Sequence, residues 1–146
     1  MSAEAKPEVN VQQAVPFFWV ADIDTSLHFY LDGLGFQMKH KWIHEGRLRW
    51  CWLTLGNAAI MLQEHWKEGQ HANVPTSPVG VGVSICFTCR DAIALYHEFK
   101  SRGLDAKRPF VGNGMWVTSV NDPDGYALFF ESVTDVPEET EYKEEK

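Results

Sequence analysis

Trp116-Val-Thr-Ser-Val-Asn-Asp-Pro-Asp-Gly-Tyr-Ala-Leu-Phe-Phe-Glu-Ser132 is the stretch that decides the fold. The β-branched and hydroxyl residues of 117–120 predict one strand, and the apolar run 126–130 predicts another. Between them, Asp122-Pro123-Asp124-Gly125 predicts a tight turn, because proline fixes φ, aspartate accepts local backbone hydrogen bonds and glycine adopts positive φ. The last strand is too apolar to have one face in water, so we expect both of its faces to be covered.

Length and composition predict a single soluble globular domain. The chain has 146 residues, of which 45% are hydrophobic, and it contains six tryptophans. No apolar run approaches the roughly 18 residues of a membrane span, and the N-terminus has neither the basic start nor the apolar core of a signal peptide. Three cysteines, an odd count, predict free thiols in a reducing compartment. We therefore expect a cytoplasmic protein with no membrane partner.

The net charge of −7 is concentrated at the ends of the chain. Residues 135–146 hold six acidic residues and two lysines. This acidic balance argues against a nucleic-acid partner. Because neither end shows apolar periodicity, we expect residues 1–11 to form a disordered or loosely docked tail and residues 135–146 an acidic tail.

Residues 12–64 predict a β-α-β-β-β module. A nearly continuous apolar run predicts a strand over 12–20, and Asp22 or Asp24 can cap the helix that follows. Ile23, Leu27, Tyr30 and Leu34 share one helical face, and the glycines at 33 and 35 end the helix. Three strands are then predicted over 36–43, 48–55 and 58–64.

The same order is predicted again after a linker over 65–78. A strand over 81–88 precedes a helix that Asp91 caps, whose buried face holds Ala92, Tyr96 and Phe99 and which ends at Gly103. A short strand near Ala106 and the hairpin of 116–132 complete a second module over 79–132. The sequence thus predicts an α+β domain over 12–134, built as two tandem β-α-β-β-β modules by internal duplication.

The chain resembles the vicinal oxygen chelate superfamily, which includes glyoxalase I, extradiol dioxygenases and bleomycin-resistance proteins. The resemblance covers residues 12–132 and is carried by the segment 20–30 with Leu34-Gly35-Phe36, and by Asn121-Asp122-Pro123-Asp124-Gly125-Tyr126. It implies that each module curls its sheet into a half-barrel with the helix outside. Paired half-barrels would then enclose a ligand and cover the second face of the last strand.

The resemblance also locates the metal ligands that enzymes of this superfamily use, one on the first and one on the last strand of each module. These positions are Val15, Met61, Ser84 and Phe129. Valine and phenylalanine have no donor atom, a thioether is soft, and an un-ionised serine is a weak ligand. We therefore expect no metal, no cofactor and no catalytic residue from the shared chemistry of the enzymes.

Turn lengths predict which strand residues share a face. A two-residue turn at Gly56-Asn57 places Met61 opposite Trp52 and Gln63 opposite Trp50 on the concave side. The helix side then holds only apolar residues: Cys51, Leu53, Leu55, Ile60 and Leu62. A four-residue turn at 122–125 would place Thr118 opposite Phe129 and Trp116 opposite Glu131.

These registers predict an aromatic ligand surface for a flat aromatic or cationic small molecule. Its expected members are Phe17, Trp19, Trp50, Trp52, Met61, Gln63, Trp116, Phe129 and Glu131. Glu131 is either a buried carboxylate that pairs with a cationic ligand or a residue at the rim. The tryptophan-rich strands could equally form core or a dimer interface.

The resemblance and the aromatic surface together favour a non-catalytic binding protein of the bleomycin-resistance type, acting as a homodimer in antibiotic resistance. One alternative is a lyase, isomerase or dioxygenase with a relocated metal, for which His44, Glu45, His65 and His71 are the candidate ligands. Another is an interaction module whose groove binds a peptide. Cys86 and Cys89 have the spacing of a zinc knuckle, but residues three apart in a strand point to opposite faces.

Overall fold

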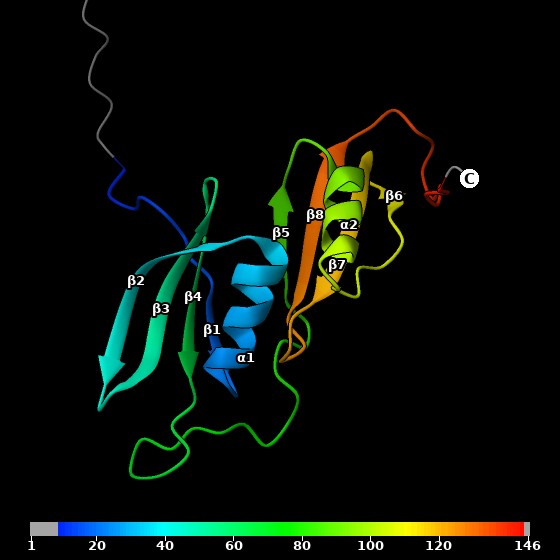
Figure 1. The fold of residues 1–146 in the computed structure, drawn as a ribbon. Coiled ribbons are helices and arrows are strands. Elements are labelled where there is room, and N and C mark those ends of the chain that lie inside the picture. The colour runs from blue at the N-terminus through cyan, green and yellow to red at the C-terminus, as the bar shows by residue number, and fades with distance from the viewer. Residues whose placement is uncertain (1–8, 145–146) are drawn as a thin grey trace, which may run out of the picture.

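The computed structural model describes residues 9–144 and contains two modules in tandem (Figure 1). The first module forms one four-stranded sheet in the order β1-β4-β3-β2, in which β1 runs parallel to β4. Its helix α1 continues as a π-helical segment η1. The bounds are β1 (Phe17–Val20), α1 (Ile23–Leu27), η1 (His28–Leu34), β2 (Gln37–His44), β3 (Arg47–Leu55) and β4 (Ala58–Glu64).

The second module repeats this topology as a separate sheet in the order β5-β8-β7-β6. Its elements are β5 (Ser84–Thr88), α2 (Ala92–Ser101), β6 (Phe110–Gly112), β7 (Met115–Asn121) and β8 (Ala127–Val133). The predicted α+β fold of two β-α-β-β-β modules is confirmed. Each sheet is open and four-stranded, and neither closes into a barrel.

The first strand of each module begins later than predicted. In the first module, the carbonyl of Pro16 accepts the Met61 N–H at 2.9 Å, but proline has no N–H with which to continue the ladder, so β1 begins at Phe17. In the second, Gly80 and Gly82 have φ values of +76° and +81°, which are turn conformations. Strand β5 therefore begins at Ser84 rather than at residue 81.

The short strand predicted near Ala106 lies instead at Phe110–Gly112. Ala106 is buried, and the neighbouring Lys107 donates one hydrogen bond to the carbonyl of Ser119 at 3.0 Å. Regular pairing with β7 starts only after Pro109, which lacks an N–H.

The predicted helix caps are present. Asp22, rather than Asp24, caps α1, because its carboxylate accepts the N–H groups of Asp24 at 3.0 Å and Thr25 at 3.4 Å. Gly35 ends the helix with a left-handed φ of 95°. Asp91 caps α2 by accepting the Ala94 N–H at 2.9 Å.

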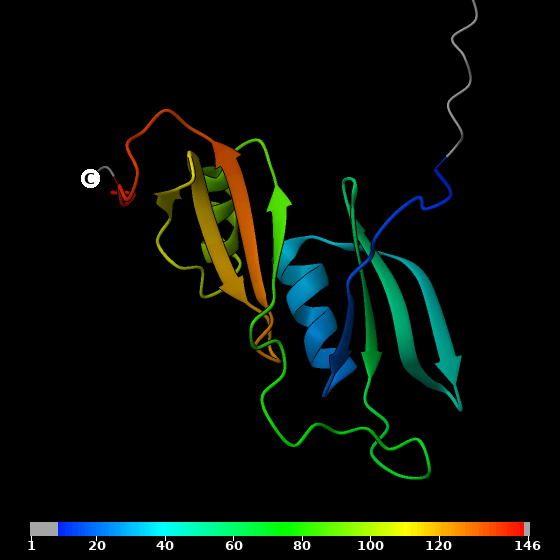
Figure 2. The same ribbon diagram turned by 180° about the vertical axis from the view of Figure 1, so that it is seen from behind.

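The two modules share one hydrophobic core. Both views show α1 between β1 and β5 (Figures 1 and 2). The Tyr30 hydroxyl donates to the Asp122 carboxylate at 2.8 Å, and the rings of Phe18 and Tyr126 stack with centroids 4.0 Å apart. These contacts join η1 and β1 of the first module to the turn between β7 and β8, so the second module packs against the first.

The acidic C-terminal segment lies along β6. The Val111 N–H donates to the Thr140 carbonyl at 2.9 Å, and the Tyr142 N–H donates to the Pro109 carbonyl at 2.8 Å. These bonds extend the outer edge of the second sheet. The predicted N-terminal tail lies largely outside the described residues. Between residues 9 and 144, no helix is long and apolar enough to cross a bilayer.

Candidate ligand-binding face

The first sheet brings most of the predicted ligand residues onto one face. The Gly56-Asn57 turn pairs Trp52 with Met61 and Trp50 with Gln63, as predicted. Strand β1 adds Phe17 beside Met61 and Trp19 beside Gln63 through its parallel pairing with β4. We name this surface of β1, β4, β3 and β2 the ligand-binding face after the role that the sequence predicts for it.

The opposite side of the same sheet is the core side. Cys51, Leu53, Ile60 and Leu62 are fully buried there, while Trp50, Trp52, Met61 and Gln63 are only partly buried. The predicted strand facing is therefore confirmed. Because α1 covers the core side and lies between the modules, the ligand-binding face points away from the second module.

Strand β2 contributes two residues that the sequence interpretation missed, Trp42 and His40. They pair with Trp50 and Trp52, and the His40 ring meets Trp52 edge-on with centroids 6.2 Å apart. This register results from a β-bulge. Leu48 pairs with Ile43 and Trp50 pairs with Trp42, while Arg49 between them pairs with no residue of β2. A bulge adds one residue to one strand and leaves no clear mark in the sequence.

The rings on this face form two rows. In the first row, Phe17, Trp19 and His65 follow one another with centroids 5.4 and 5.9 Å apart. The second row consists of Trp42, His44 and Trp66, with centroid separations of 5.3 and 6.1 Å.

Two buried ring nitrogens on this face, Trp52 Nε1 and His65 Nδ1, have no hydrogen-bond partner within the described chain. An unpaired buried polar atom costs about 1–3 kcal/mol, and such atoms are uncommon in native proteins.

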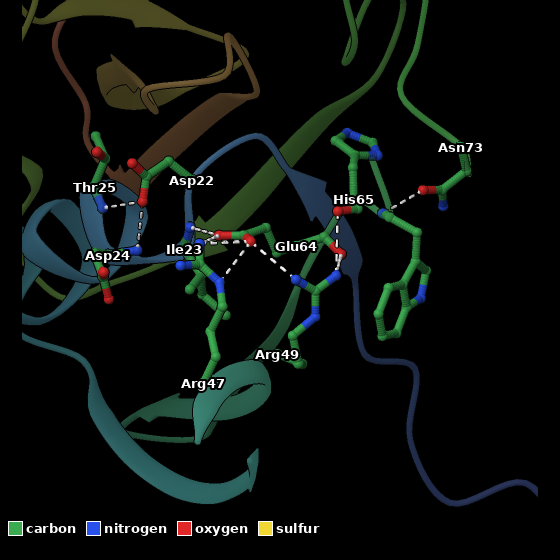
Figure 3. A network of polar contacts seen from close by, with 10 residues as sticks. Asp22, Ile23, Asp24, Thr25, Arg47, Arg49, Glu64, His65 and Asn73 are labelled. Atoms are coloured by element: carbon green, nitrogen blue, oxygen red, sulfur yellow. Dashed lines mark hydrogen bonds and ion pairs between the residues drawn. The ribbon is translucent and has the colours of Figure 1, made fainter. Parts of the chain in front are cut away.

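A buried ion-pair network anchors one end of the ligand-binding face (Figure 3). Glu64 is 1% exposed, and its carboxylate accepts the Ile23 N–H at 2.9 Å. The same carboxylate accepts hydrogen bonds from Arg47 at 2.7 Å and from Arg49 at 3.1 Å. Burial acts to raise the pKa of Glu64, but the Ile23 N–H and Arg47 outweigh it and hold that pKa below its usual value. Glu64 is therefore an ionised structural carboxylate.

The predicted register of the second hairpin is wrong by one residue. Asn121 pairs with Ala127, so the turn holds residues 122–126, five rather than four. The Asp122 carboxylate accepts the N–H groups of Asp124 and Tyr126, each at 2.9 Å, which draws Tyr126 into the turn. Side chains alternate between the two faces along a strand. One extra residue in the turn therefore places each β7 side chain on the opposite face from the one predicted relative to the side chains of β8.

Trp116 consequently lies on the helix side of the second sheet and not with Phe129 and Glu131. It pairs with Ser132, and its ring packs edge-on against Tyr142 at 6.0 Å. Trp116 therefore belongs to the packing of the C-terminal segment rather than to the ligand surface predicted for it.

Phe129 and Glu131 do lie on the open face of the second sheet, which Figure 2 shows from the side opposite α2. There the Cys86 thiol donates to the Glu131 carboxylate at 2.7 Å. Burial and the nearby carboxylate raise the pKa of Cys86 to about 11, so the thiol is protonated at neutral pH. No ring contact or side-chain hydrogen bond within residues 9–144 joins this open face to the ligand-binding face.

Three of the four positions of the family's metal ligands lie in the expected strands, and Val15 does not, because β1 begins at Phe17. Val15 precedes β1, Met61 is on β4, Ser84 begins β5 and Phe129 is on β8. None offers a strong donor to a divalent ion.

The alternative set of His44, Glu45, His65 and His71 does not come together. The His65 ring stacks on Trp19, while His71 contacts Gln70 at 3.2 Å. Across the described part of the chain, no three His, Cys, Asp or Glu side chains are close enough to hold an ion.

A separate open cleft of about 1070 Å³ lies between the modules beside α2. Leu34, Leu55, Phe87, Leu95 and Arg102 are among the residues that line it. None of the predicted ligand residues reaches it, so it is distinct from the ligand-binding face.

The protein consists of two β-α-β-β-β modules, and the sheet of the first presents an open aromatic face. Comparison with known proteins identifies the family to which this fold belongs. The family model described as Glyoxalase/Bleomycin resistance protein/Dioxygenase superfamily matches residues 12–130. The chain belongs to this superfamily. A search of curated protein sequences found no match.

Solved structures with the same fold share little sequence with this chain. SMU.1112c is 18% identical with a TM-score of 0.68, and the alignment covers 85% of this chain and 100% of that one. TnmS3, an antibiotic binding protein from Streptomyces sp. CB03234, is 19% identical with a TM-score of 0.64, covering 87% and 100%. A glyoxylase/bleomycin resistance protein/dioxygenase domain from Frankia sp. EAN1pec is 17% identical with a TM-score of 0.63, covering 87% and 99%. At this level of identity the likeness establishes the fold.

Proposed function

We propose that this protein binds and sequesters a small molecule without catalysis, on the ligand-binding face of the first sheet. The observation that carries the proposal is the composition of that face. Its paired strand residues are aromatic, imidazole, thioether, amide and hydroxyl side chains, and none is a carboxylate or an ammonium. Such a surface suits a flat aromatic molecule held by stacking, and no three His, Cys, Asp or Glu side chains within residues 9–144 lie close enough together to hold a metal ion.

Stacking on tryptophan also suits a cationic ligand. Aromatic pairs contribute about 0.5–1.5 kcal/mol beyond area burial, and a cation over a ring contributes about 0.5–2 kcal/mol. The description of TnmS3 as an antibiotic binding protein supports a natural antibiotic as the ligand class.

We further propose that the protein is a homodimer. Apolar side chains are exposed on both open sheet faces, with Phe17 at 40%, Trp42 at 44%, Phe110 at 43% and Val133 at 83%. A second copy related by a two-fold axis would cover both faces at once, since each copy offers both surfaces. Phe129 and Glu131 of one copy would then lie over the ligand-binding face of the other, and Glu131 would supply a carboxylate for a cationic ligand. The three free thiols are consistent with a cytoplasmic location.

Fluorescence titration tests the binding proposal. Ethidium is a flat aromatic cation and anilinonaphthalene sulfonate a flat aromatic anion, and we expect ethidium to bind more tightly. Trp52→Leu should weaken ethidium binding about tenfold, since a stacked cation contributes up to about 2 kcal/mol and about 1.4 kcal/mol is a factor of ten in affinity. Trp116→Leu is the matched control and should leave the affinity unchanged, because that ring lies on the other face of the other sheet. Equal losses in the two variants would remove the ligand-binding face from the proposal.

Light scattering at micromolar concentration tests the dimer. An interface of about 800 Å² per partner is expected for a stable complex. A monomeric mass would refute the dimer and leave Glu131 outside the ligand site.

The alternative function is a metal-dependent lyase, isomerase or dioxygenase with a relocated metal site. A tightly held ion would favour it over sequestration, and the metal analysis described below distinguishes the two.

A further inference from the structure

Arg49 lies where the two rows of rings meet. The first row ends at His65 and the second at Trp66. The Arg49 guanidinium donates to the backbone carbonyls of Glu64 at 3.3 Å and His65 at 3.2 Å. The guanidinium carbon also lies 3.9 Å from the centre of the Trp66 ring. One side chain therefore contacts the last residue of both rows.

The β-bulge explains how Arg49 reaches this position. Arg49 is the unpaired residue of β3, between the pairs Trp42–Trp50 and Ile43–Leu48. Bulges release a side chain from the regular alternation of a strand and redirect it. The Arg49 side chain is 10% exposed, and it spans from the Glu64 carboxylate to the Trp66 ring.

Arg47 provides an internal comparison. It donates to the same Glu64 carboxylate at 2.7 and 3.1 Å, and its side chain is 52% exposed. Within residues 9–144 its side-chain hydrogen bonds go to Glu64 alone, and its guanidinium stacks on no ring, although its backbone pairs with that of His44. The two arginines thus share the neutralisation of Glu64, but of the two only Arg49 stacks on a ring of the ligand-binding face.

We propose that Arg49 is a positioning residue that fixes the relative placement of the two rows and so determines which flat ligands fit between them. As far as ligand choice is concerned, this inference rests on the proposed function. A planar guanidinium can stack on a ring while it donates in its own plane to two carbonyls and a carboxylate. A lysine ammonium would preserve the charge opposite Glu64 but could not make all of these contacts.

The test compares Arg49→Lys with Arg47→Lys. Each variant keeps both positive charges beside Glu64, so a merely electrostatic role predicts the same behaviour from both. We expect Arg49→Lys to change the near-ultraviolet circular dichroism of the tryptophans and to weaken ethidium binding about tenfold. Arg47→Lys should match the wild type in both measurements, and the far-ultraviolet spectra of both should be unchanged.

Two results would overturn the inference: an unchanged near-ultraviolet spectrum for Arg49→Lys, or equal changes in both variants. The near-ultraviolet spectrum is measured without a ligand. Failure of the wild type to bind ethidium would therefore count against the proposed function, and the spectra of the two variants would still test the positioning role. Should Arg49→Lys not fold, Trp66→Leu replaces it, because it removes the stacked ring and leaves the ion pairs of Glu64 intact. An ethidium affinity equal to that of the wild type in Trp66→Leu would then overturn the inference.

Discussion

Replacing Tyr30 by phenylalanine removes one hydroxyl from the junction between the modules. That hydroxyl donates to the Asp122 carboxylate at 2.8 Å, and both residues are buried. A hydrogen bond to a charged group contributes about 1.5–3 kcal/mol, and the carboxylate stays buried when its donor is lost. We therefore expect Tyr30→Phe to lower the free energy of unfolding by about 1.5–3 kcal/mol in urea denaturation and the Tm by roughly 4–10 °C.

Tyr126→Phe is the matched control, since it removes a second hydroxyl from the same junction. The Tyr126 hydroxyl donates to the neutral backbone carbonyl of Trp19 at 3.0 Å in a half-buried site. Such a bond contributes only about 0.5–1.5 kcal/mol. If Tyr30→Phe cost no more than Tyr126→Phe, the reasoning that the buried carboxylate makes the Tyr30 bond the stronger one would be refuted.

Three further predictions concern pH, backbone and thiol chemistry. Because the pKa of Glu64 is lower in the folded state, its ionisation stabilises the fold fully above the unfolded glutamate pKa of about 4.3. This stabilisation is lost as the pH falls through the folded pKa. Glu64→Gln should therefore make the free energy of unfolding depend less steeply on pH in the acid range. Gly80→Ala should lower the free energy of unfolding, measured in urea, by more than about 1 kcal/mol and by more than Gly82→Ala does. Both glycines have positive φ, but only at Gly80 would a methyl group meet a ring carbon of Tyr126, at 2.9 Å. Cys86, with a pKa of about 11, should react slowly with a thiol reagent at pH 8, and Glu131→Gln should speed that reaction when labelling is read by mass spectrometry.

The two hairpins show why sequence reasoning succeeded in one module and failed in the other. The turn after β3 consists of Gly56 and Asn57, and their chemistry limits it to two residues, which fixed every pair between β3 and β4. The turn before β8 has equally clear residues, but Asp122 binds the N–H of Tyr126 and lengthens it by one. Four-residue and five-residue turns begin with the same residues, so the sequence alone could not separate them.

The sequence predicted only those residues of the ligand-binding face that follow the regular alternation of a strand. Trp50 and Trp52 alternate with buried neighbours and were found, whereas Trp42 and His40 depend on bulges in the pairing of β2 with β3. The network around Glu64 also escaped the sequence interpretation, since it joins residues far apart in the chain. Long-range partners of this kind leave no periodic pattern in a single sequence.

Elemental analysis of the protein, purified without added metal and dialysed, shows whether the ligand-binding protein carries a resident metal ion. Val15, Met61, Ser84 and Phe129 offer no set of three or four donors that could converge at the roughly 2.0–2.3 Å that zinc requires. We expect zinc, nickel and iron to be present at well below one equivalent per chain. One equivalent of tightly held metal, lost when His65 or Glu131 is replaced, would contradict this expectation and favour a metal-dependent enzyme.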